Sequence, residues 1–102
     1  MSVAAATKIA TSLGLTESEL FHLTLLSFLR EKKRQVLQLK LELLARYGTD
    51  SVAGLESRIA QNLVIEHPAW EDLIVAENLT ARLEELDAYL SDLQDTAGDR
   101  AA

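Results

Sequence analysis

The sequence predicts an all-α protein in which two long helices form an elongated hairpin. Leu and Ala supply most of the apolar composition, and both residue types favour helices. Residues 17–47 contain neither Gly nor Pro, and leucines near the C-terminal end recur at alternating spacings of three and four. With 102 residues, of which 48% are hydrophobic, the chain fits a single domain, 1–95, followed by a frayed tail, 96–102.

The first two predicted helices cover residues 3–13 and 17–47. Gly14 stands where a left-handed C-terminal cap ends the first of them. Thr16 and Glu19 match a capping box, in which each side chain satisfies the other residue's backbone amide. The second helix would be roughly 45 Å long at about 1.5 Å per residue, whereas a compact chain of about 100 residues has a radius of gyration near 13 Å. We therefore expect an elongated molecule.

The second helix carries two apolar blocks, 20–29 and 36–44, separated by the polar stretch 30–35. The first block is apolar on nearly every side, and such a helical segment is normally buried on every side. We therefore expect it to contact the first helix and at least one further surface.

A short third helix, 52–61, should connect the two long ones, because residues 49–51 are capping-type residues. The linker 62–67 contains Leu63, Val64 and Ile65, which are too apolar for a solvated loop, so we expect them to pack against a helix. Pro68 suits the first turn of a fourth helix, where its missing amide is no loss.

The fourth helix carries a leucine seam flanked by acidic residues. Its apolar positions follow the a/d spacing of a coiled coil, and a seam that extends beyond its intramolecular partner is usually closed by a second copy. We therefore predict coiled-coil-like packing and a homodimer. The seam residues, which we expect to mediate self-association, are Ala76, Leu79, Leu83, Leu86, Leu90 and Leu93.

The charge of the chain is −6 and is unevenly distributed. Residues 1–50 hold seven Lys/Arg against five Asp/Glu, whereas residues 51–102 hold three against eleven. The acidic balance disfavours non-specific binding to nucleic acid without excluding it, and the two halves of the chain can pair with each other. The chain has no cysteine and no apolar run long enough to span a membrane, so we expect a soluble, cytoplasmic protein.

The sequence gives no sign of catalysis, of a metal site or of a cofactor. Its two histidines, His22 and His67, are 45 positions apart, and no nucleotide-binding or hydrolase motif is present. Glu66, His67, Glu71 and Asp72 gather near one helix start, where acidic residues favour the positive end of the helix dipole. We interpret this group as a helix entry, and we expect the protein not to be an enzyme.

Two features are candidates for binding a partner. Trp70, the sole tryptophan, is of a type enriched in binding hot spots, although a core position in this chain or its dimer is the interpretation that we prefer. The basic run of Arg30, Lys32, Lys33 and Arg34 could bind nucleic acid or an acidic protein. A solvated face, or pairing with the acidic fourth helix, is the interpretation that we prefer for this run.

Residues 9–20 resemble a helix-turn-helix, which makes a DNA-binding regulator one alternative function. Against this alternative, the helix that would enter the DNA groove begins with Glu17 and Glu19, which would face phosphates.

Two further stretches carry a family resemblance. The first stretch, residues 10–30, has the form A-x-x-L-G-L-T-x-x-E-L…F-L-R. The second stretch comprises residues 46–51, Leu55 and the segment 66–73. Together they are similar to small helical antitoxin-like proteins of prokaryotes, which are encoded beside a toxin. The resemblance implies a non-catalytic protein that binds and neutralises a cognate toxin. A self-associating structural coiled-coil protein is the remaining alternative.

Overall fold

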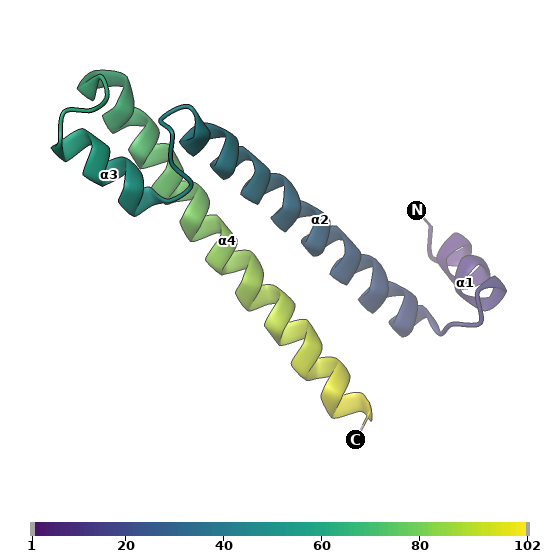
Figure 1. Cartoon of the computed structure of the whole chain (residues 1–102). Coiled ribbons are helices and arrows are strands. Elements are labelled where there is room, and N and C mark those ends of the chain that lie inside the picture. Colours follow the sequence, from purple (N-terminus) through teal and green to yellow (C-terminus); the bar gives the residue numbers. More distant parts are fainter. Residues whose placement is uncertain (1, 102) are drawn as a thin grey trace.

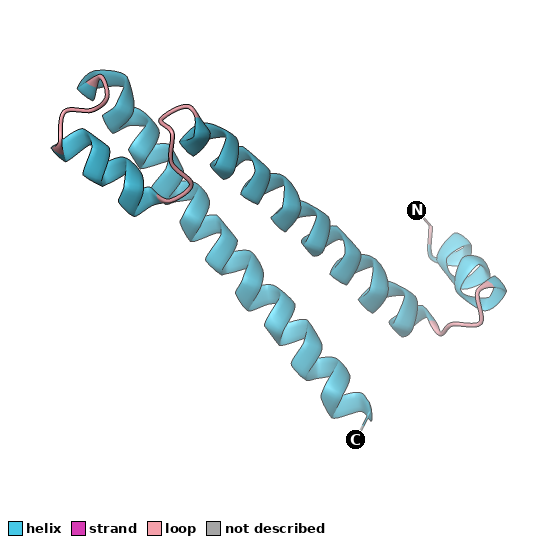
Figure 2. Cartoon of the chain, in the orientation of Figure 1, coloured by secondary structure: helices cyan, strands magenta, loops and turns pink. Residues whose placement is uncertain are grey.

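The computed structural model describes the backbone of residues 2–101 and the side chains of residues 2–95. Every regular element in this part of the chain is an α-helix (Figure 2). The helices are α1 (Val3–Ser12), α2 (Glu17–Ala45), α3 (Val52–Ala60) and α4 (Glu66–Ala101). The all-α class and the predicted order of two long and two short helices are thus confirmed.

The molecule is elongated, as the length of the second helix predicts. It measures 60 × 29 × 16 Å and has a radius of gyration of 19.7 Å. Helices α2 and α4 run antiparallel and pack along each other, while α3 packs on α4 (Figure 1). We call the end at which α3 links α2 to α4 the closed end of the hairpin. At the opposite, open end, α1 contacts the beginning of α2.

Short-range hydrogen bonds start the first three helices where the sequence predicts. The capping box is complete: the Glu19 amide donates to Thr16 Oγ1 at 3.0 Å, and the Thr16 amide donates to Glu19 Oε1 at 3.2 Å. Ser51 caps α3 by accepting from the Gly54 amide at 2.9 Å. Gly14 takes a left-handed φ of +73° in the turn between α1 and α2, a conformation that favours glycine.

Helix α4 begins at Glu66, two residues earlier than the predicted start at Pro68. The proline still lies in the first turn, where backbone amides lack intrahelical partners. The Ala69 amide is the first beyond Pro68, and it donates to the Ile65 carbonyl at 3.3 Å. The predicted frayed tail, 96–102, lies outside the residues whose side chains are described.

The core is concentrated at the closed end, where three helices meet. Tyr47, Val52 and Val64 pack around its edge. Ala69 and Ala76 have no exposed surface, and their small side chains allow neighbouring helices to approach α4 closely. Outside this cluster the buried apolar side chains that the structure describes are Ala10, Val36 and Leu86, so the open end depends on fewer buried side chains. The cluster comprises Leu43, Leu44, Leu55, Ile59, Ala69, Leu73 and Ala76.

Two burial expectations are wrong. The block 20–29 is not buried on all sides, since Phe21 is 69% exposed and Phe28 is 65% exposed. Helix α4 covers only one side of α2, and α1 is too short to cover the rest. In the linker before α4, Val64 packs against the core as expected, but Leu63 and Ile65 are exposed.

Candidate partner-binding surfaces

The leucine seam of α4 is largely occupied within the single chain. Ala76 and Leu86 are buried, and the other four seam residues are half-buried where α4 packs along α2. A coiled-coil seam needs one apolar partner surface, and α2 supplies it here. Self-association through this seam therefore remains a prediction, and most of the seam already has an intramolecular partner.

The basic run of α2 is engaged partly with α4 and partly with its own helix. Lys33 Nζ lies 2.6 Å from Asp87 Oδ1 of α4, so one member forms the predicted pairing with the acidic helix. Arg34 forms a two-pronged pair with Glu31, at 2.7 and 2.9 Å, and these hydrogen bonds lower the pKa of Glu31. Arg30 is exposed and Lys32 is half-buried. The run therefore does not present four cations together to a partner.

Trp70 does not lie in the core of this chain, so the preferred interpretation is wrong for the single molecule. Its side chain is 47% exposed, whereas its neighbours Ala69 and Leu73 are buried. The indole Nε1 donates to Glu66 Oε1 at 3.0 Å, one helical turn earlier. This hydrogen bond satisfies the polar atom of the ring and fixes its orientation on the surface of α4.

Other exposed apolar side chains accompany Trp70 at the closed end. Ile74 follows it by one turn of α4, and Leu63 and Ile65 precede it in the linker. We call these four residues the tryptophan patch. Glu66 and Glu71 of the first turns of α4 are exposed beside it. An exposed apolar patch with a polar rim is typical of a protein-binding site.

The polar groups around the start of α4 do not form a metal site. His67 Nε2 lies 3.8 Å from Glu71 Oε1, and both side chains are largely exposed. Among the residues that the structure describes, no three His, Asp or Glu side chains are placed to hold a metal ion together.

A contact that the sequence did not reveal joins the loop after α2 to α4. The Tyr47 hydroxyl donates a hydrogen bond to the Asp72 carboxylate. This bond, with a smaller effect of burial, raises the pKa of Tyr47 to about 12. The two residues are 25 positions apart, so no local pattern could have paired them. The contact fixes the loop beside the start of α4 and hence supports the tryptophan patch.

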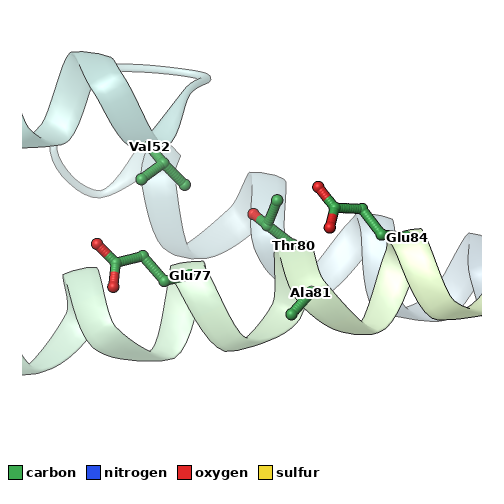
Figure 3. A pocket seen from close by; sticks show the side chains of 5 residues that line it. All are labelled: Val52, Glu77, Thr80, Ala81 and Glu84. Atoms are coloured by element: carbon green, nitrogen blue, oxygen red, sulfur yellow. The ribbon is translucent and has the colours of Figure 1, made fainter.

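A shallow groove lies where α3 meets α4 (Figure 3). It is lined by Val52 of α3 and by Glu77, Thr80, Ala81 and Glu84 of α4. Its volume of about 210 Å³ is below the roughly 300 Å³ at which small-molecule sites begin. The Thr80 hydroxyl already donates to the Ala76 carbonyl at 2.8 Å. The groove therefore offers little to orient a small ligand.

The helix-turn-helix segment forms a helix pair, but its polar groups bond within the pair. The Thr7 hydroxyl of α1 donates to the Glu17 carboxylate at the start of α2, and Glu19 closes the capping box. Acidic groups thus occupy the position from which DNA would be read. DNA binding remains an alternative without support from this geometry.

The fold and its surfaces define an all-helical hairpin protein with an exposed apolar patch at its closed end. None of the described helices is both long enough and apolar enough to cross a membrane. The chain belongs to the family described as Uncharacterized protein MJ0235, whose match covers residues 1–98. Neither a curated protein nor a solved structure matches it.

Proposed function

We propose that this protein is a non-catalytic protein-binding module that docks a partner protein on the tryptophan patch. The observation that carries the proposal is the half-exposed Trp70 beside the exposed Leu63, Ile65 and Ile74. A large indole ring held in one orientation loses little conformational freedom on binding, which is why tryptophan is enriched in hot spots. The four side chains together supply an apolar centre for an interface.

The charge around the patch specifies the kind of partner. Glu66 and Glu71 flank Trp70, and residues 51–102 hold eleven acidic against three basic residues. A partner with a complementary surface would present an apolar centre surrounded by Lys and Arg. Such a partner agrees with the antitoxin-like resemblance, in which an acidic protein covers a basic toxin. The antitoxin role, with a cytoplasmic location, is the narrower form of the proposal.

The narrower form is tested by co-expressing the chain with the protein encoded beside it and measuring the mass of the eluted species by light scattering. A complex that is lost on Trp70→Ala and on Ile74→Glu is the expected result. Leu13→Ala, which removes an exposed leucine at the open end, is the matched control and should leave the complex intact. Separate elution of the two proteins would overturn the antitoxin form.

Trp70 also provides a direct spectroscopic test, since it is the only tryptophan in the chain. Binding on the patch should shift its fluorescence emission to shorter wavelength, because the half-exposed ring becomes buried. A complex that forms with unchanged emission would place the partner elsewhere and refute the assignment of the patch. A complex with promoter DNA in a mobility-shift assay, formed without any protein partner, would favour the regulator alternative.

A further inference from the structure

A second apolar surface lies at the open end of the hairpin, on a flank of α2. Phe21 and Phe28 are seven residues apart, so they lie on the same side of the helix. Leu25 lies between them, and Leu39 continues the stripe toward the closed end. Positions 21, 25, 28, 32, 35 and 39 alternate spacings of four and three, the heptad spacing of a helix that packs against another helix, with Lys32 and Gln35 as the polar members of the stripe. α4 does not cover this flank, because both phenylalanines are about two-thirds exposed.

Helix α4 carries a matching stripe on its own flank. Positions 75, 79, 82, 86, 89 and 93 follow the same alternation. Positions 79, 86 and 93 belong also to the predicted seam, whereas 75, 82 and 89 each precede a seam residue by one, and Arg82 is the charged member of the stripe. Val75 and Tyr89 on this stripe are each close to half exposed. The two stripes meet in an apolar groove of about 420 Å³, lined by Leu25, Leu29, Tyr89, Asp92 and Leu93. We call Phe21, Leu25, Phe28, Tyr89 and Leu93 the phenylalanine face.

This surface is not the one that α3 covers. Val52 of α3 lies over Glu77, Ala81 and Glu84 of α4 (Figure 3). At about 100° per residue, those positions lie on a different side of α4 from Tyr89. A helical hairpin of this kind, with a short helix on one face and apolar side chains on the other, has the arrangement of one half of a four-helix bundle.

We infer that the phenylalanine face is the interface between two copies of this chain, which form a four-helix bundle with α2 of each copy beside α4 of the other. Both helices of one face carry the heptad spacing, so the face is complementary to itself, as a two-fold interface must be. The apolar residues are concentrated at the open end. Two such faces overlap fully when the open ends of both copies lie together.

A two-fold axis that runs along the hairpins keeps the two open ends together and places α2 of one copy beside α4 of the other. Lys33 pairs with Asp87 within each chain, so Lys32 of one copy lies near the height of Tyr89 of the second copy. Glu85, one turn away on α4, is paired with Arg82 at 3.0 Å, so Lys32 approaches an ion pair and not a lone carboxylate. A two-fold axis across the hairpins would instead place α2 beside α2, with the two hairpins pointing in opposite directions.

The area available suits a dimer. If each phenylalanine side chain presents about 200 Å² when fully exposed, the two rings leave roughly 270 Å² uncovered in each copy. That area is about a third of the roughly 800 Å² per partner in a standard interface. Leu39 and Tyr89, 55% and 45% exposed, and the half-buried Leu25 and Leu93 bring the total to roughly 600 Å², near the lower limit of a stable interface. This inference is independent of the tryptophan patch, which lies at the other end of the hairpin.

The oligomeric state of the purified chain tests the inference. Light scattering coupled to gel filtration should give twice the chain mass of 11.3 kDa. The double variant Phe21→Glu and Phe28→Glu should elute at the mass of one chain with its helical circular dichroism retained. The matched control is Leu23→Glu with Leu41→Glu, two exposed leucines on the other flank of α2, and it should remain dimeric. A monomeric parent chain, a dimeric phenylalanine variant or a monomeric control would each overturn the proposal.

Disulfide trapping tests the arrangement without destabilising substitutions, because the chain has no cysteine. A chain with Lys32→Cys mixed with a chain carrying Tyr89→Cys should form a mixed disulfide under mild oxidation, because the Lys33–Asp87 pair places these two stripe positions within about one residue of the same height. Arg30→Cys, which is exposed on the other flank of α2 at a similar height, mixed with the same Tyr89→Cys chain is the control and should give none. Efficient trapping of the Lys32→Cys chain with itself would show α2 beside α2 and would refute the arrangement inferred here.

Discussion

Replacing Leu55 with alanine should destabilise the protein by about 3 kcal/mol. Leu55 of α3 has no exposed surface, and it is one of seven residues in the core cluster. The three lost carbons are worth roughly 2.4 kcal/mol at about 0.8 kcal/mol per buried methylene, and the remaining cavity adds to that loss. A domain of this size is stable by only about 5–15 kcal/mol, so the effect is a large fraction of the total. Helix α3 is held by only one other buried side chain, Ile59.

Urea unfolding followed by far-UV circular dichroism, at one fixed protein concentration, measures this change. With a urea dependence near 1.5 kcal/mol per molar, the midpoint should fall by about 2 M. Leu63→Ala is the matched control, since the same atoms are removed from a side chain that is 61% exposed. It should change the free energy of unfolding by no more than about 0.5 kcal/mol. Equal effects of the two substitutions would refute the placement of the core at the closed end.

Two further predictions concern contacts around the loop after α2. Tyr47 should titrate near pH 12 in a Tyr89→Phe background, as measured by phenolate absorbance, because the hydrogen bond to Asp72 favours the neutral phenol. The raised pKa in the folded state means that this contact stabilises the protein below pH 10 and is lost as the pH rises from about 10 to about 12; titration near 10 would contradict the contact. Gly54→Ala should fail to give the gain of about 1 kcal/mol expected from helix propensity, because the new methyl group would overlap the Thr49 hydroxyl. Thermal unfolding measures this effect, and a clear stabilisation would show that the Thr49 side chain moves aside without cost.

The helix boundaries were predictable from the sequence, because local contacts set them. The capping box joins Thr16 and Glu19, which are three positions apart, and both of its hydrogen bonds form as predicted. Gly14 and Gly48 both adopt the left-handed conformation where helices end. The predicted start of α4 at Pro68 was late by two residues, since proline is tolerated anywhere in the first turn and does not mark its first residue.

The candidate binding surfaces were predictable only in part. Trp70 was recognised as a possible anchor, but its exposure was misjudged because its neighbours Leu73 and Ile74 differ in burial: they lie about 100° apart around α4, and Leu73 is buried whereas Ile74 is exposed. The apolar block 20–29 was expected to be buried because its apolar residues are distributed around the whole helix, so the sequence does not indicate which side faces solvent. Which of its side chains remain exposed depends on where α4 lies, and no residue within the block encodes that position.

The sequence by itself determined the class of the protein, the order and approximate ends of its helices, and its elongated shape, because propensity, capping and helix length depend on residues near one another. The tertiary structure alone decided which sides of α2 and α4 face each other. That choice occupies the leucine seam within the chain and leaves the phenylalanine face and the tryptophan patch exposed. It depends on the sum of many weak contacts between residues far apart in the sequence, such as Lys33 with Asp87 and Tyr47 with Asp72.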